Sequence, residues 1–372
     1  MKQRLRRNMF LHVTLSVLLL LSVSALAQDA SAIPDAAEAW DEATAVRIGF
    51  DGDTVDIQGE GATLSNNILT ISKAGTYVFS GIWESGQVCI DADKKDVVRL
   101  MFNGVSIHCP DSAPLYAIQA GKVILTLLTD TKNALSDGGS YAYPEEEPDA
   151  ALYVQDSLLI NGQGSLLITA RFKNGIVSKD DLLIESGILS VTAADVGIRG
   201  RDTLAITGGE ITVDARGDAL QSNNSDDPEK GCILLTGGTC HLTSLKDGIQ
   251  AESSLTISGG AYTIFTGGLT ASGEGTESRY TGGSSGDAAG KGMKAEGDIV
   301  LSGGTFALYC ADDAIHAEGS VIIRDCVLEI ATGDDGIRAG QSVTIDGGKL
   351  SFAKCLDGTD SSAVFISDGG GQ

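Results

Sequence analysis

Aspartates at a fixed place in a repeat are the residues of this sequence best suited to chemistry. The strings DDAIH and DDGIR contain the doublets Asp312-Asp313 and Asp334-Asp335. Single carboxylates occupy the same place at Asp218, Asp247 and Asp357, with Asp195 as a weaker case. Adjacent carboxylates repel each other, so they need a cation or basic neighbours. Oxygen ligands of this kind suit calcium, which accepts irregular coordination geometry.

A repeat of about 22 residues positions these aspartates. Small residues mark the register at Gly175, Gly197, Ala219, Gly248, Gly292, Ala314, Gly336 and Gly358. Two units are lengthened, by an insertion at 223–231 and by another at 269–290. Because like residues recur one unit apart, we expect the units to stack on one another.

Each unit contains alternating apolar residues, such as Leu204/Ile206 and Ile211/Val213, separated by Gly-Gly or Asp-Gly turns. Alternation indicates strands with one buried face. The constant register predicts three short strands per unit in a parallel β-helix, an all-β solenoid. The period of two excludes a helical solenoid, and a propeller blade usually needs about 40 residues.

Stacking would bring the aspartates of successive coils within about 5 Å of each other. At that distance two charges repel by roughly 3 kcal/mol at an effective dielectric constant of about 20. Calcium between coils would offset this repulsion, and we predict it at Asp312, Asp313, Asp334 and Asp335 first. Asp218, Asp247 and Asp357 are the next candidates. For a single Asp-Gly, a simple turn remains the alternative.

A second row, two residues after each register position, offers the other way to offset the acids. It holds Val177, Arg199, Gln221, Gln250, Lys294, His316 and Arg338. We expect Arg199, Lys294, His316 and Arg338 to neutralise the aspartates or to contact a ligand, and both remedies can operate together.

The N-terminus indicates export. Four basic residues precede an apolar run at 9–23, and small residues end at Ala27. This predicts a secretory signal peptide at 1–27, cleaved after Ala27, with an uncleaved anchor as the alternative. We expect no other membrane segment and an extracellular location. With 26 basic and 50 acidic residues, the chain is unsuited to nucleic acid.

The remaining segments divide as a cap with early coils at 28–130, a polar loop at 131–150 and regular coils at 151–372. The last coil lacks a polar cap, so we expect end-to-end self-association or a shorter chain than is usual for such proteins. The seven cysteines predict no disulfide framework, although Cys89–Cys109 could pair.

The strings DDAIHAEGSVIIRD, GDDGIRAGQSVTIDGG, KDGIQAESSLTISGG and KGMKAEGDIVLSGG resemble a bacterial secreted carbohydrate-binding β-helix family, known for a clostridial protein that binds cellulose and polygalacturonate. AGTYVFSG and TDTKNALSDGGSYAY resemble its N-terminal part. The resemblance implies a right-handed parallel β-helix like that of pectate lyases. It also implies bound calcium at Asp312–Ala314 and Asp334–Gly336, and plant cell-wall polysaccharide as ligand. Val196 and Lys291 depart from the pattern.

Three functions fit these features. The first is calcium-dependent binding of polygalacturonate or cellulose, with no catalytic residue assigned. The second is a calcium-dependent polysaccharide lyase, in which an arginine or lysine would act as base. The third is an adhesion solenoid without a specific glycan. Aromatic rings often stack on sugars, and we expect Trp83, Tyr141, Tyr143 and Tyr280 to be exposed, with loop packing as the alternative role.

Overall fold

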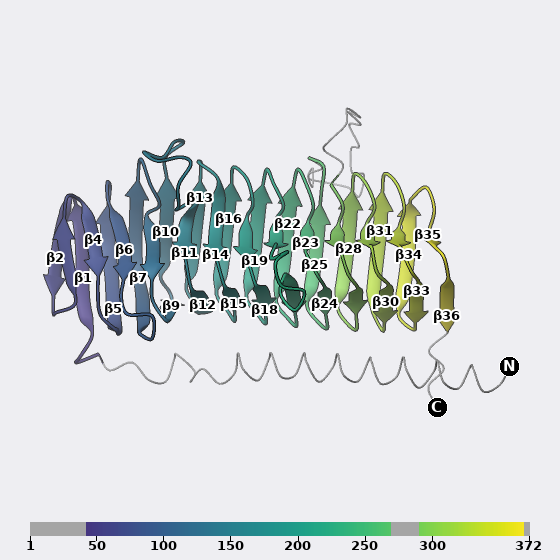
Figure 1. Cartoon of the computed structure of the whole chain (residues 1–372), viewed down its shortest axis with the longest axis horizontal. Coiled ribbons are helices and arrows are strands. Elements are labelled where there is room, and N and C mark those ends of the chain that lie inside the picture. The colour runs from purple at the N-terminus through teal and green to yellow at the C-terminus, as the bar shows by residue number, and fades with distance from the viewer. Residues whose placement is uncertain (1–41, 269–289, 368–372) are drawn as a thin grey trace. The chain divides into compact units, whose positions relative to one another are not determined.

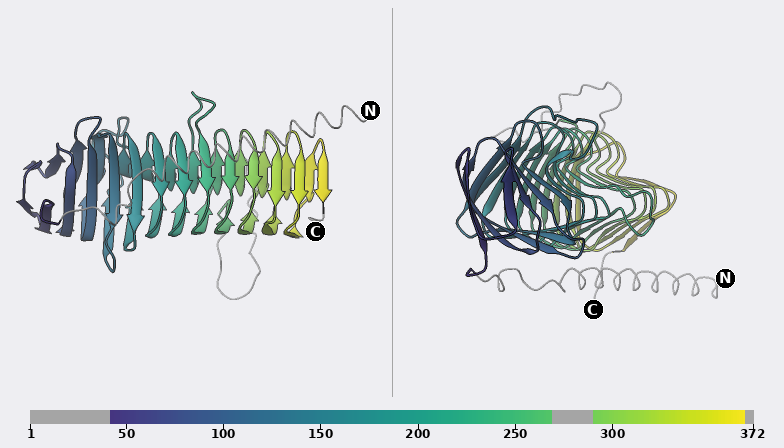
Figure 2. Two further views of the ribbon diagram at one scale, coloured as in Figure 1. Left: turned by 90° about the horizontal axis from the view of Figure 1, so that it is seen from below. Right: turned by 60° about the vertical axis from the view of Figure 1, so that its left-hand side comes forward.

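Residues 42–268 and 290–367 of the chain are described by a computed structural model, and they form an all-β solenoid. The predicted signal peptide, most of the second insertion and Tyr280 lie outside these residues. Figures 1 and 2 show coils stacked along one axis, and the oblique view in Figure 2 shows coils of similar outline one behind another. The parallel β-helix predicted from the repeat is confirmed.

Each regular coil contributes one strand to each of three parallel ladders, as the alternation predicts. Ladder 1 contains β9 (Lys122–Leu127), β12 (Ser157–Gly162), β15 (Asp181–Ile184), β18 (Thr203–Ile206), β21 (Cys232–Leu235), β24 (Leu255–Ile257), β27 (Ile299–Leu301), β30 (Val321–Arg324), β33 (Val343–Asp346) and β36 (Val364–Ser367). Ladder 2 contains β10 (Lys132–Asp137), β13 (Ser165–Ala170), β16 (Ile188–Ala193), β19 (Glu210–Ala215), β22 (Thr239–Ser244), β25 (Ala261–Phe265), β28 (Thr305–Cys310), β31 (Val327–Thr332) and β34 (Lys349–Lys354).

Ladder 3 forms a sheet of its own and carries the acidic turns at its edge. It contains β3 (Ala62–Ser65), β4 (Ile68–Ile71), β6 (Gln87–Asp91), β8 (Leu115–Gln119), β11 (Ala150–Val154), β14 (Asn174–Ser178), β17 (Ile198–Gly200), β20 (Leu220–Ser222), β23 (Ile249–Ala251), β26 (Met293–Ala295), β29 (Ile315–Ala317), β32 (Ile337–Ala339) and β35 (Thr359–Ser361). Most of its strands have three residues, of which only the middle one faces outward.

The N-terminal end has a different construction. The longer strands β1 (Val46–Gly52), β5 (Gly75–Trp83) and β7 (Val97–Cys109) join ladders 1 and 2 into one sheet, and the short β2 (Thr54–Gln58) pairs with β1 at the end of that sheet. β7 pairs with β9 through its first half and with β10 through its second half, so the sheet divides there. Antiparallel pairs β1–β2 and β3–β4 provide the expected N-terminal β cap.

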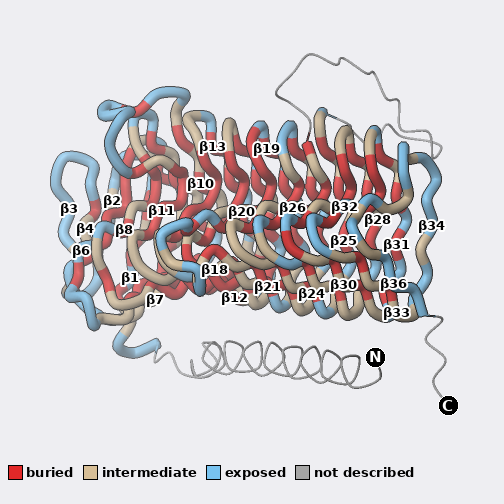
Figure 3. Tube along the Cα trace, turned by 45° about the vertical axis from the view of Figure 1, so that its right-hand side comes forward, coloured by how far each residue is buried: buried red, intermediate tan, exposed pale blue. Residues whose placement is uncertain are grey.

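Stacked aliphatic side chains fill the interior. Figure 3 marks the buried residues along the backbone, and these recur from coil to coil. One such stack in ladder 3 is fully buried and contains Ile176, Ile198, Leu220, Ile249, Met293, Ile315 and Ile337. Burying one such side chain contributes about 2–3 kcal/mol. Cys240, Cys310 and Cys326 are buried in this core as small apolar residues.

Several expectations about single residues are corrected. Cys89 and Cys109 are both buried as free thiols, and none of the seven cysteines is paired. Trp83 and Tyr141 were expected on the surface, but they are buried because each packs against another ring, Phe50 and Phe172 respectively. Residues expected to begin the polar loop instead form β10, which leaves a loop at 138–149.

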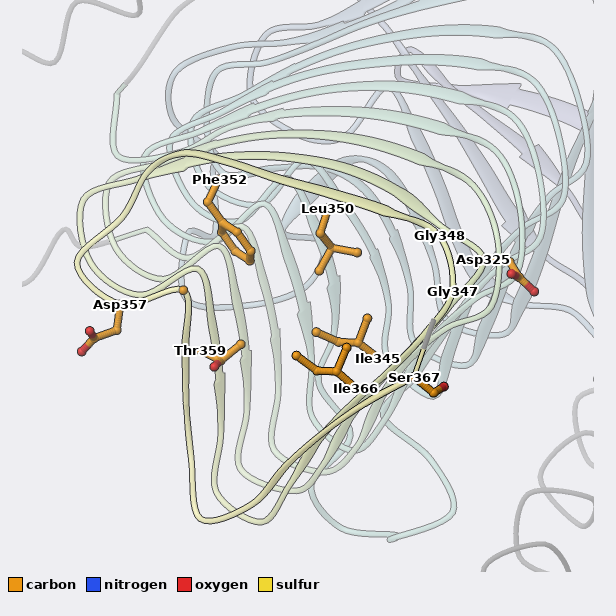
Figure 4. A pocket seen from close by; sticks show the side chains of 11 residues that line it. Asp325, Ile345, Gly347, Gly348, Leu350, Phe352, Asp357, Thr359, Ile366 and Ser367 are labelled. Atoms are coloured by element: carbon orange, nitrogen blue, oxygen red, sulfur yellow. The ribbon is translucent and has the colours of Figure 1, made fainter. Parts of the chain in front are cut away.

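The C-terminal end of the described solenoid is open. Figure 4 looks into this end, where Ile345, Leu350, Phe352 and Ile366 line a pocket of about 700 Å³. Phe365 and Ile366 are largely exposed. Asp357 lines this pocket, whereas the four aspartates of the doublets do not, and self-association at this end stays a prediction.

Candidate functional site

The acidic residues form two columns along the turn between ladders 2 and 3. We call the residue directly before each register position the inner column. It contains Asn174, Val196, Asp218, Asp247, Lys291, Asp313, Asp335 and Asp357. The residue before that belongs to the outer column, which contains Lys173, Asp195, Gly217, Lys246, Gly290, Asp312, Asp334 and Leu356. The pairing of ladder 3 places each member next to its counterpart in the following coil.

Register glycines are needed for space rather than for a left-handed backbone. A Cβ on Gly336 would lie 2.5 Å from Phe352 Cε1 and 2.8 Å from the carbonyl oxygen of Gly358 in the next coil. Gly336 has no positive φ, and alanine occupies the same position at Ala219 and Ala314. Left-handed glycines occur elsewhere, for instance in a Gly-Gly turn between ladders 1 and 2 at Gly304, with φ 99°.

Four of the eight inner-column side chains accept a backbone N–H from the following coil. Asp218 Oδ1 accepts the Asp247 N–H at 2.9 Å, and Asp247 Oδ1 accepts the Lys291 N–H at 2.8 Å. Asp313 Oδ1 accepts the Asp335 N–H at 3.1 Å. The uncharged Asn174 does the same for Val196 at 3.1 Å. This bond is therefore a structural role of the position, and sequence reasoning did not predict it.

In Asp218 and Asp313, the second carboxylate oxygen contacts the side chain three residues later, which lies in the same coil and faces outward. Gln221 Nε2 donates to Asp218 Oδ2 at 2.7 Å, and His316 Nδ1 lies 2.7 Å from Asp313 Oδ2. These two outward side chains thus hydrogen-bond to the column. Arg199, Lys294 and Arg338 instead pair with acids outside it, namely Asp149, Glu296 and Asp360. Asp218 is held through both of its oxygens in this way, and neither Asp218 nor Asp247 belongs to a group of three converging carboxylates.

Three carboxylates converge at the doublets. One ligand atom each from Asp312, Asp313 and Asp334 lies within 4.8 Å of the others, and in the described chain this is the group of acids that could hold a metal ion. Asp313 is buried, while Asp312 and Asp334 are half-buried. The predicted residue Asp357 is exposed and lies outside the group, as do Asp218 and Asp247.

The charge in this group is incompletely offset. Burial would raise the pKa of Asp313, but the hydrogen bond from His316 and the Asp335 amide outweigh burial and lower it. Desolvation raises the pKa of Asp334, and its neighbour Asp313 raises it further. The pKa of Asp335 is raised by desolvation and then by Asp334.

Asp335 provides an independent sign of a missing partner. Its side chain is 6% exposed, and its Oδ1 is buried without a hydrogen bond. The Asp357 amide lowers the pKa of Asp335, but Oδ1 itself has no hydrogen-bond partner. A buried carboxylate oxygen without a partner costs free energy, and a cation beside Asp334 and Asp313 would offset that cost.

The second row, two residues after each register position, is called the outward row here, and it lies on the outer face of ladder 3 next to the acidic columns. Its C-terminal part holds Gln250, Lys294, His316 and Arg338, which are half-buried or exposed. Its N-terminal part is covered by the loop at 138–149, because Tyr153 and Val177 there are fully buried. Arg199 belongs to the covered part, since its Nη2 lies 3.2 Å from Asp149 Oδ2.

Comparison with known proteins gives the family. A family model described as carbohydrate-binding domain-containing protein matches residues 65–336. The chain belongs to this carbohydrate-binding domain-containing family. A carbohydrate-binding domain-containing protein of Acetivibrio thermocellus is 32% identical over 226 residues, which are 60% of this chain and 79% of that protein.

A protein of solved structure that is similar to this chain has the same fold. It is the polysaccharide lyase-like protein from C. thermocellum, studied as a gadolinium derivative, with 31% sequence identity and a TM-score of 0.62. The alignment covers 69% of this chain and 96% of that one. The matched residues 65–336 include the carboxylates of Asp312, Asp313 and Asp334, whereas Arg338 lies just beyond them.

Proposed function

We propose that this carbohydrate-binding protein is secreted and uses calcium to recognise plant cell-wall polysaccharide, polygalacturonate first and cellulose second. The observation that carries the proposal is the convergence of Asp312, Asp313 and Asp334 at the edge of an open row of basic and polar side chains. The family supports carbohydrate binding in general. Calcium and the choice of glycan are the parts that the proposal adds.

The residues present fit calcium. The converging atoms are all carboxylate oxygens, which are hard ligands, and the group lacks the sulfur ligands that favour softer metals. Asp335 adds a buried oxygen that lacks a partner.

The charge of the ligand explains why a cation would matter. The chain has a net charge of −24, so an anionic polysaccharide is repelled at long range. Calcium would supply positive charge at the turn and could be shared between protein and uronate carboxylates. Lys294, His316 and Arg338 lie on the adjacent face and would donate hydrogen bonds to carboxylate and hydroxyl groups.

A co-sedimentation assay on insoluble pectate and cellulose, with calcium and with EDTA, tests the proposal. We expect calcium-dependent binding that the double change Asp312→Asn and Asp334→Asn abolishes. Asp195→Asn is the matched control, because it removes an outer-column acid far from the convergent group. Binding that is equal in EDTA, or equal in the double variant, would contradict the proposal, and circular dichroism would confirm that each variant is folded.

Lyase activity is the second candidate, favoured by the likeness to a polysaccharide lyase-like protein. Such chemistry needs a deprotonated base near the uronate. Desolvation lowers the pKa of Lys294, but the hydrogen bond to Glu296 outweighs it and the pKa is raised, so Lys294 stays protonated at neutral pH. Binding therefore fits this lysine better. Release of unsaturated uronides, followed by ultraviolet absorbance, would decide for the lyase.

Secretion is part of the same proposal and has its own test. Expression in a bacterial host with an active export pathway should yield a mature protein that begins at Gln28, as determined by N-terminal sequencing. Retention of the first 27 residues on an exported protein would favour an uncleaved anchor instead. In the described residues, no helix has the length and apolar character needed to cross a membrane.

A further inference from the structure

Lys291 interrupts the acidic column at its most charged point. It occupies an inner-column position between Asp247 on one side and Asp313 on the other. Its backbone N–H donates to Asp247 Oδ1, so its coil keeps the regular turn. Its Nζ forms an ion pair with Asp312 Oδ2, and the two side chains are only 19% and 16% exposed. The lysine thus takes the place of an acid without changing the backbone.

The ammonium group acts on several carboxylates at once. Besides contacting Asp312, its positive charge favours the ionised forms of Asp247, Asp313 and Asp334, although burial keeps the pKa values of Asp247 and Asp334 raised. These are acids on both sides of the Lys291 coil. Lys291 is therefore a fixed monovalent cation on the N-terminal side of the convergent group, in the position where a mobile ion would otherwise offset the repulsion.

We propose that Lys291 is a built-in counter-ion that competes with a divalent cation for Asp312 and so sets the affinity of the convergent site. This inference rests on the proposed calcium site. Lys291 holds one of the three converging carboxylates in an ion pair and places a like charge beside the incoming ion. The site should therefore bind calcium weakly, in the range of about 10⁻⁴ to 10⁻³ M that is typical of extracellular modules.

The substitution Lys291→Met tests this role by removing the charge and keeping most of the apolar stem. We expect at least about tenfold tighter calcium binding in isothermal titration calorimetry with calcium chloride, because a repulsive charge a few ångströms from the ion is lost. In EDTA the variant should melt below the wild type, since Asp312 loses its partner. Saturating calcium should then raise its melting temperature by more than that of the wild type.

Two further variants distinguish competition from a general effect of charge or folding. Lys246→Met removes the same charge from an exposed outer-column lysine and should leave calcium affinity unchanged. Lys291→Arg keeps the charge and should retain weak binding. If Lys291→Met does not fold, Lys291→Gln provides the same test with a polar side chain.

The outcomes separate this inference from the proposed function. Calcium binding by the wild type with equal or weaker binding by Lys291→Met would overturn the role of Lys291 and leave the calcium site intact. No calcium binding by either protein would overturn both. Binding by Lys291→Met alone would support competition, while showing that the native chain uses its lysine instead of the metal.

Discussion

The two halves of the inner column, on either side of Lys291, solve the same electrostatic problem differently. On the N-terminal side, Asp218 and Asp247 each give one oxygen to the amide of the next coil, and Asp218 gives the other to Gln221. On the C-terminal side, doublets add the carboxylates of Asp312 and Asp334, and three ligand atoms converge. The backbone is alike in both halves, so the outer-column residues account for the difference.

This difference teaches that an acidic column is not by itself a metal site. One carboxylate per coil can be accommodated by an amide and a polar neighbour, because each oxygen then has a donor. A second carboxylate in the same turn exceeds the donors that the coil provides. The buried Asp335 Oδ1 without a hydrogen bond shows this shortage. A metal role is therefore expected where doublets stack in consecutive coils.

The largest expected effect separates the two halves by their response to calcium. Saturating calcium should stabilise the wild type by about 2–3 kcal/mol, as expected for a ligand near 100 times its dissociation constant. Asp334→Asn should abolish this gain because it removes one of three converging ligands. Asp247→Asn should retain it, since an asparagine oxygen can still accept the Lys291 amide. Differential scanning calorimetry in calcium and in EDTA measures both, and an equal loss in the two variants would contradict the division.

The next effect concerns pH and the N-terminal half. Burial, and then Asp247, raises the pKa of Asp218 to about 6. Because the unfolded carboxyl ionises near pH 4, the folded state holds a proton that the unfolded state has released between about pH 4 and 6. Ionisation of Asp218 therefore lowers the free energy of unfolding as pH rises through that window. Above the window the folded protein stays destabilised by the full free-energy cost of the buried charge.

Asp218→Asn should remove this cost, on the order of 2 kcal/mol above pH 6. Asn174 shows that an amide side chain can make the same bond to the next coil. Urea denaturation at pH 4 and pH 7.5 in EDTA should give a gain at the higher pH only. A loss of stability at pH 7.5 would mean that the ionised Asp218 has a role beyond the bonds described, and Asp195→Asn controls for the change in net charge.

Sequence patterns predicted the fold well because a solenoid repeats its signals. The step of about 22 residues located the turns, and alternation gave three ladders. The convergent carboxylates Asp312, Asp313 and Asp334 are all among the residues predicted first. Stacked neighbours are one repeat apart, so proximity can be calculated from register alone.

Contacts that do not follow the register could not be predicted in this way. The ion pair between Lys291 and Asp312 depends on how a long side chain crosses to the next coil. The cover over Tyr153 and Val177 depends on a loop that folds back over ladder 3, with Asp149 reaching Arg199. The need for glycine at position 336 likewise comes from the neighbouring ring of Phe352, a contact that the register alone does not give.

The smallest expected effect sharpens the contrast between the covered and open parts of the outward row. Arg199 is 15% exposed and paired with Asp149, so Arg199→Ala should cost about 1 kcal/mol of stability and leave pectate binding unchanged. Arg338 is 49% exposed, with Nε 3.9 Å from Asp360, so Arg338→Ala should hardly alter stability. If the open row contacts the glycan, Arg338→Ala should instead weaken pectate binding several-fold. Urea denaturation and co-sedimentation on pectate measure the two properties separately, and weaker binding by Arg199→Ala alone would place the glycan on the covered part of the row.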